Sequence, residues 1–161
     1  MKKIFFMSLL SFIPLLNCSV TNQVDDKEFK VVYFDKNIQK NIIINEPERF
    51  LELINNLVLG VDDLYKLIVT NKTIKEVKEN NSGMEILLSN EMCIDLNIGK
   101  TLKFRKLLIP FVNQSDSTEK ASTVVLYCGG KKYFTPPYIN SKGSLILEEI
   151  RAICIDSMNK K

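Results

Sequence analysis

The segment Thr123–Thr135, T-V-V-L-Y-C-G-G-K-K-Y-F-T, carries the clearest local structural signal in this chain of 161 residues. β-Branched and aromatic residues fill both arms, and Gly129-Gly130 between them suits the positive φ angles of a two-residue hairpin turn. Pro136-Pro137 follows and should end the second arm, because proline has no N–H to donate to a sheet. The expected cross-strand pairs are Leu126 with Tyr133 and Val125 with Phe134.

Other short segments rich in apolar and β-branched residues predict further strands. Short polar connections join the later ones, including a turn at Asn80–Gly83, and Pro110 is expected to close that block. The predicted strands are Phe29–Phe34, Ile42–Ile44, Leu64–Val69, Met84–Ser89, Cys93–Ile98 and Leu102–Ile109.

Three segments place apolar residues at helical spacing. The first should begin at Asn45, with Asn45 as N-cap and Glu48 placed for a capping box, and should stop at Gly60. Thr70 is a suitable cap for a short helix through about Glu79. The last helix is expected over Leu145–Met158.

This order of elements predicts an α+β fold for residues 29–161, which we interpret as a single domain. A mostly antiparallel sheet with about three helices packed on one face is the simplest way to bury these apolar stripes. The composition of 45% hydrophobic and 25% charged residues is typical of a globular protein.

The first 17 residues have the layout of a secretory signal. Lys2 and Lys3 precede the uncharged apolar run Ile4–Leu16. A helix of that length rises about 20 Å, less than a bilayer core of about 30 Å, so a permanent span is disfavoured. We expect residues 1–17 to form a cleavable signal helix.

Leu15-Leu16-Asn17-Cys18 ends this run and resembles the lipobox of bacterial lipoproteins, in which Leu stands three positions before an obligatory Cys. Leu15 and Cys18 match the pattern, whereas Leu16 and Asn17 differ from the small residues usual there. The resemblance implies cleavage after Asn17, acylation of Cys18 and anchoring to a membrane of the bacterial cell envelope. Residues 18–28 would then be a lipidated polar tether. The alternatives are a simple secretory signal cut elsewhere and an apolar helix buried in a cytosolic fold.

The charge and residue content argue against several functions. The chain has no His, the usual neutral-pH base and a common metal ligand. Its formal charge of +3 falls to +1 when Lys2 and Lys3 are removed with the signal, since 20 basic groups then face 19 acidic ones. A nearly neutral domain is a poor match for nucleic acid. We predict no catalytic residue, no metal site and no cofactor.

Three cysteines remain if Cys18 is lipidated, namely Cys93, Cys128 and Cys154. Their wide spacing fits either one disulfide with one free thiol or three small buried apolar residues. The spacing does not choose between these arrangements.

Aromatic residues around the predicted hairpin form the candidate contact surface, because Tyr suits positions with one buried and one wet end. The alternative is that they fill the core and its rim. The expected function is non-enzymatic binding, or a structural role, in a lipid-anchored envelope protein with an unknown envelope partner. There are two alternatives: an inhibitor or immunity-type protein against an exported enzyme, and a small carboxylate-dependent hydrolase. The contact residues are Tyr127, Tyr133, Phe134 and Tyr138.

Overall fold

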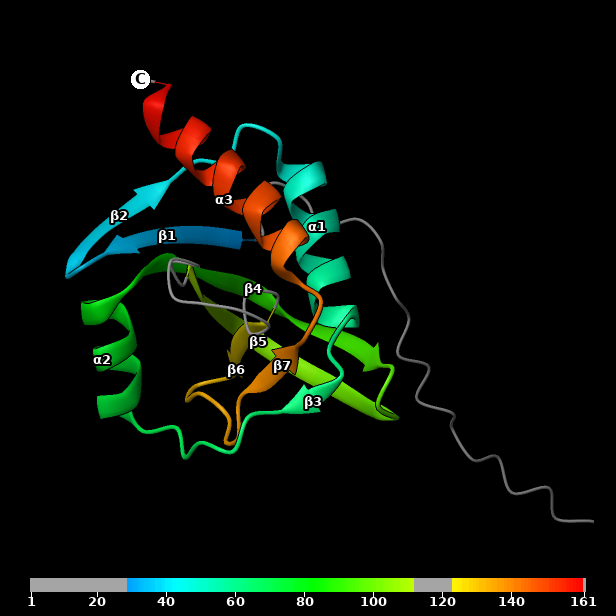
Figure 1. Ribbon diagram of the computed structural model, residues 1–161. Coiled ribbons are helices and arrows are strands. Elements are labelled where there is room, and N and C mark those ends of the chain that lie inside the picture. Colours follow the sequence, from blue (N-terminus) through cyan, green and yellow to red (C-terminus); the bar gives the residue numbers. More distant parts are fainter. Residues whose placement is uncertain (1–28, 112–122, 161) are drawn as a thin grey trace, which may run out of the picture.

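A seven-stranded antiparallel sheet forms the body of the fold in the computed structural model, which describes residues 29–111 and 123–160 (Figure 1). The strand order is β2-β1-β4-β5-β6-β7-β3. With three helices on this sheet, the predicted α+β class is confirmed. The strands are β1 Phe29–Asp35, β2 Ile38–Ile42, β3 Asp63–Leu64, β4 Ser82–Leu96, β5 Lys100–Phe111, β6 Val124–Gly129 and β7 Tyr138–Asn140.

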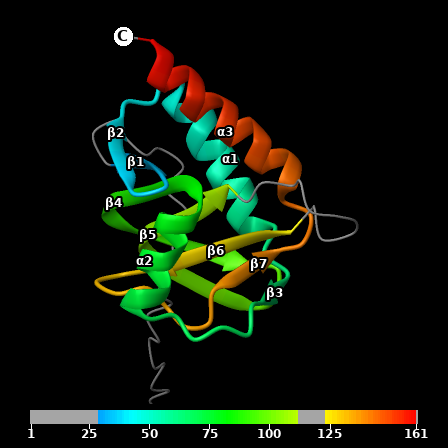
Figure 2. The same cartoon turned by 60° about the vertical axis from the view of Figure 1, so that its left-hand side comes forward.

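The helices cover both faces of the sheet. Helices α1 (Pro47–Leu59) and α3 (Ser144–Asn159) lie side by side on one face, and α2 (Asn71–Asn80) lies on the other (Figures 1 and 2). The expectation that all helices pack on one face is therefore wrong for α2. The reason is that the central strands carry apolar side chains on both faces, so each face requires a cover.

The main core lies between the sheet and the α1–α3 pair. Phe50 and Ile54 of α1 and Ile150 of α3 are fully buried against Met84 and Leu107 of the central strands. Each such side chain contributes about 1.5–3 kcal/mol through removal of apolar surface from water. These contacts hold the two long helices on the sheet.

A smaller core lies on the opposite face. Phe34 of β1, Leu108 of β5 and Tyr127 of β6 form it, and Ile74 and Val77 of α2 pack over them. Thr70 caps α2 as predicted, since its hydroxyl accepts the Thr73 N–H at 3.1 Å and the Thr73 side chain completes a capping box. This second core supports the candidate site.

Two predicted strand boundaries in the middle of the sheet are wrong. The segments Met84–Ser89 and Cys93–Ile98 belong to one long strand, β4, whose register shifts between Leu87 and Met92. A β-bulge of this kind absorbs the intervening polar residues without ending the strand. The predicted turn at 80–83 is also replaced, because β4 begins at Ser82.

Pro110 lies inside β5 rather than closing it. The β5–β6 ladder ends at the pair Leu108↔Tyr127. Pro110 therefore follows the last residue of β5 that pairs with β6, where a missing N–H is tolerated.

Other element ends also differ from the expectation. Helix α1 starts at Pro47, with Glu46 rather than Asn45 at the N-cap and no side-chain cap, so the predicted cap and capping box are wrong. The Asn45 backbone N–H donates to Ser157 Oγ on α3 at 3.3 Å. Strand β2 covers residues 38–42, before most of the predicted Ile42–Ile44. Of the strand predicted at Leu64–Val69, only Leu64 lies in the sheet, as the second residue of β3. Its neighbouring segment contains Pro136-Pro137, which cannot donate to a ladder.

Candidate contact surface

The chain reverses after β6, but not through the predicted two-residue turn. Gly129 forms a bridge with Tyr133, so three residues lie between them. A Cβ on Gly129 would lie 2.4 Å from the Lys132 carbonyl oxygen, which explains the need for glycine there. The predicted cross-strand pairs are wrong, because β6 pairs with β7 beyond the two prolines. The observed pairs are Leu126↔Tyr138 and Val125↔Ile139.

This register separates the four predicted contact residues. Tyr127 is buried in the smaller core, and Tyr133 packs beside it. Tyr138 packs against the main core, on the other face of the sheet. Phe134 is 38% exposed. Phe134 is thus the member of this set most open to solvent, whereas Tyr133 lies at the edge of the same surface.

Tyr133 is held by an ion pair that lies beneath α2. Its hydroxyl donates to Glu85 Oε1, and Lys78 Nζ of α2 donates to Glu85 Oε2 at 2.5 Å. The Lys78 and Glu85 side chains are only 17% and 13% exposed. Burial, and then the adjacent Glu85 carboxylate, raise the pKa of Tyr133 well above its usual range. Tyr133 therefore remains a hydrogen-bond donor at neutral pH.

Lys106 of β5 fixes the other side of the same loop. Its ammonium group lies 4.3 Å from the centroid of the Tyr133 ring, within cation–π range. It also donates to the Lys131 carbonyl oxygen at 2.9 Å. The loop after β6 is thus tied to β4, α2 and β5 through side chains.

The segment before α2 runs antiparallel to this loop. The Tyr65 N–H donates to the Pro137 carbonyl oxygen at 2.9 Å, and the Val69 N–H donates to Thr135 Oγ1 at 3.0 Å. Thr135 Oγ1 in turn donates to the Val69 carbonyl oxygen at 3.3 Å. These bonds place two irregular segments, 65–70 and 133–137, next to each other.

Three exposed apolar side chains stand on these two segments, and we call them the contact cluster: Tyr65 (47% exposed), Ile68 (75%) and Phe134 (38%). Sequence reasoning missed Tyr65 and Ile68 because the run at 64–69 was interpreted as a strand in the sheet. Pro136 and Pro137, which leave this run with an incomplete ladder partner, lie far from it in the sequence, so no local signal marks the difference.

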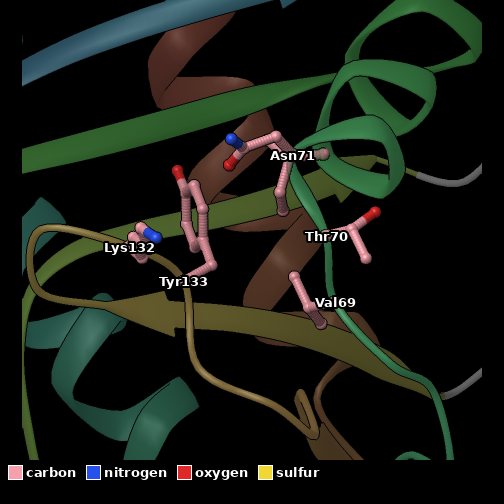
Figure 3. Close-up of a pocket in the computed structure, with 6 residues that line it drawn as sticks. Val69, Thr70, Asn71, Lys132 and Tyr133 are labelled. Carbon is pink, nitrogen blue, oxygen red and sulfur yellow. The ribbon is translucent and has the colours of Figure 1, made fainter.

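A hollow lies between the start of α2 and the loop after β6, next in the chain to Ile68 and Phe134 of the contact cluster (Figure 3). Its volume is about 220 Å³. Figure 3 shows the Tyr133 ring standing between Lys132 and the first residue of α2, Asn71. The walls combine aliphatic groups with an ammonium, an amide and hydroxyls. The lining residues are Val69, Thr70, Asn71, Ile74, Lys132 and Tyr133.

Two of the cysteines are buried free thiols. Cys128 lies in β6 and Cys154 in α3. Burial raises the pKa of Cys128 strongly and that of Cys154 to about 12. Because both thiols are free, no disulfide joins any two of Cys93, Cys128 and Cys154, so that expected arrangement is wrong. Cys128 and Cys154 are small buried core residues, as the other arrangement expected of all three, whereas Cys93 is half-buried in β4.

Cys18, the predicted lipidation site, lies outside the described residues, as do the predicted signal at 1–17 and the rest of the tether at 18–28. In the part of the chain that the structure describes, no helix has the length and apolarity needed to cross a bilayer. The same residues contain no group of three or more His, Cys, Asp or Glu side chains placed to hold a metal ion.

Comparison of the chain with protein-family models, curated proteins and solved structures gave no match.

Proposed function

We propose that this protein binds another protein of the bacterial cell envelope through the contact cluster and the adjoining hollow, without a catalytic role. The observation that supports this proposal is the grouping of Tyr65, Ile68 and Phe134 on two adjacent segments beside that hollow. Exposed apolar and aromatic side chains next to a recess are typical of protein-binding surfaces.

The hydrogen bonds of the surface support binding further. The Tyr133–Glu85–Lys78 contacts and the Val69–Thr135 hydrogen bonds fasten the two segments to the sheet and to each other. A preorganised surface loses less conformational entropy when a partner docks. The apolar side chains are therefore presented at low entropic cost.

The lipid anchor is the second part of the proposal. The pattern of Lys2, Lys3, the apolar run and Leu15 before Cys18 supports acylation of Cys18 after export. An acylated chain stays at the membrane surface, where the local concentration of membrane-bound partners is high. The domain would then meet its partner at the envelope.

Site-specific photo-crosslinking in intact cells tests the binding surface. A photoreactive amino acid at Ile68 or Phe134 should give the same discrete crosslinked species. Leu145 is the matched control, because it is a 78% exposed apolar residue on α3, which packs on the opposite face of the sheet. Equal crosslinking from Leu145, or no crosslink from either surface position, would overturn the proposal.

A further inference from the structure

Among the described residues, strand β2 leaves one edge of the sheet open. It is the terminal strand of the strand order, and β1 is the one described strand with which it pairs (Figures 1 and 2). Four of its five residues, Ile38 to Asn41, are exposed. It contains no proline, and its pairing with β1 is regular over five residue pairs. The edge thus lacks the prolines and bulges that often block strand addition.

The hairpin turn determines which backbone groups point outward. Lys36 and Asn37 have φ angles of 43° and 78° and form a two-residue turn between Asp35 and Ile38. In such a hairpin the residues that flank the turn exchange hydrogen bonds, and the bonded pairs then alternate along the ladder. Ile38, Lys40 and Ile42 therefore bond to β1.

Gln39 and Asn41 consequently direct their N–H and C=O groups away from β1. Among the described residues, no hydrogen bond engages these four outward groups. They are two donors and two acceptors in the spacing that an added antiparallel or parallel strand requires.

The hairpin around this edge is positively charged. Lys30, Lys36 and Lys40 are exposed, and none of them forms an ion pair with another described residue. Asp35 is the single acidic residue between 29 and 42, so the hairpin has a net charge of +2 from three lysines and one aspartate. The charge favours an acidic partner.

The same positive charge argues against a second copy of this chain as the partner that pairs with the β2 edge. Two-fold antiparallel pairing over the full length of β2 places Lys40 directly opposite Lys40 of the other copy. Like charges at directly opposite positions destabilise a ladder, and a lysine on an edge strand commonly prevents self-association. A carboxylate opposite Lys40 reverses the sign of this interaction.

We propose that the open edge of β2 binds an extended, acidic peptide segment of a partner protein as an eighth strand of the sheet. The backbone groups of Gln39 and Asn41 supply the main-chain hydrogen bonds, and Lys40 pairs with a carboxylate on the added strand. The β2 edge is at the opposite end of the strand order from β3. The segment 65–70, which carries Tyr65 and Ile68 of the contact cluster, directly follows β3. The proposal is thus independent of the proposed function.

Fluorescence anisotropy with two labelled peptides tests this site on the full chain in detergent. One nine-residue peptide alternates glutamate and valine, and the other has lysine in place of each glutamate. We expect saturable binding of the acidic peptide and at least about tenfold weaker binding of the basic one. Equal binding of both peptides, or no binding of the acidic peptide, would overturn the proposal.

Two substitutions at Asn41 separate backbone from side-chain effects. Asn41→Pro removes an outward N–H without touching the β1 ladder, whereas Asn41→Ala keeps the N–H and removes only the side-chain amide. We expect Asn41→Pro to weaken peptide binding about tenfold or more, and Asn41→Ala to bind within about twofold of the wild type. Wild-type affinity in a folded Asn41→Pro variant contradicts the site. If the wild type is a dimer in sedimentation and Asn41→Pro is a monomer, the occupant is a second copy instead.

Discussion

The hydroxyl of Tyr133 donates to the carboxylate of Glu85, which lies 48 residues earlier in the chain. Glu85 also accepts from Lys78, so one carboxylate joins the loop after β6 to β4 and α2. Hydrogen bonds to a charged acceptor in a poorly exposed site are stronger than neutral surface ones. This contact therefore determines how firmly the candidate contact surface is held.

Removal of the Tyr133 hydroxyl should destabilise the fold. Tyr133→Phe keeps the ring under Lys106 but leaves Glu85 with one partner fewer, and we expect a loss of about 1.5–3 kcal/mol in the free energy of unfolding. Urea denaturation measures this change. Tyr65→Phe is the control, since Tyr65 is 47% exposed, and it should change stability by less than about 0.5 kcal/mol. Equal effects of the two substitutions would contradict the role of the Tyr133–Glu85 bond.

Removal of the Lys78 ammonium group should lower the free energy of unfolding more than Tyr133→Phe does. Lys78→Met leaves the Glu85 carboxylate poorly exposed and without its counter-ion, and breaking a buried pair in this way costs about 3–5 kcal/mol. The exposed pair Lys72–Glu76 provides a matched control on the same helix, and Lys72→Met should cost less than about 1 kcal/mol. The double variant Lys78→Met/Glu85→Gln should recover part of the loss, because glutamine still accepts from Tyr133. Urea denaturation of all three variants measures the differences.

Stability should fall at alkaline pH in a way that depends on Tyr133. Its pKa is raised in the folded state, so the folded state retains a proton that the unfolded state releases above about pH 10. The stabilisation is thus fully present below that pH and is lost as pH rises toward the folded-state pKa. The difference in unfolding free energy between wild type and Tyr133→Phe should shrink by up to about 1.4 kcal/mol per pH unit. The measurement covers roughly pH 9 to 11, which brackets the reference pKa of tyrosine. If the difference in unfolding free energy between the two proteins does not change over this range, the pKa of Tyr133 is not raised by folding.

The thiols of Cys128 and Cys154 should resist modification in the folded protein. Both side chains are buried, and their pKa values are raised, so accessible thiolate is scarce at neutral pH. The test uses a chromogenic disulfide reagent at about pH 8, close to the reference pKa of a cysteine thiol. The reagent should label these two residues only after denaturant is added. Peptide mapping by mass spectrometry identifies the modified positions, and rapid labelling of either one in the native protein would contradict its burial.

Acylation of Cys18 gives a prediction about the anchor. Cells grown with a fatty-acid analogue should incorporate label into the wild-type protein and not into Cys18→Ala, because the proposed acceptor is the Cys18 thiol. Cys154→Ala, which removes a free buried thiol, should still be labelled, and this control separates lipidation from general effects of cysteine loss. Equal labelling of wild type and Cys18→Ala would contradict acylation at this residue.

The sequence by itself was sufficient where a structural signal is local. The aromatic and β-branched residues of β1 predicted that strand, Thr70 marked the start of α2, and apolar spacing located α3 at nearly its full length. These patterns reflect backbone propensity, capping and the helical repeat, which depend on residues within a few positions of one another.

Tertiary structure decided what depends on residues far apart in the chain. Leu126 pairs with Tyr138 rather than Tyr133, α2 packs on the opposite face from α1 and α3, and Tyr65 approaches Pro137. The Tyr133–Glu85–Lys78 contacts likewise join three separate elements. The local pattern is compatible with several strand registers and with packing of α2 on either face of the sheet. The choice among them follows from the burial of both apolar faces of the sheet and from the pairing of buried polar groups. The sequence therefore placed Tyr133 and Phe134 near one turn, whereas only the folded chain brought the segment 65–70 next to the segment 133–137.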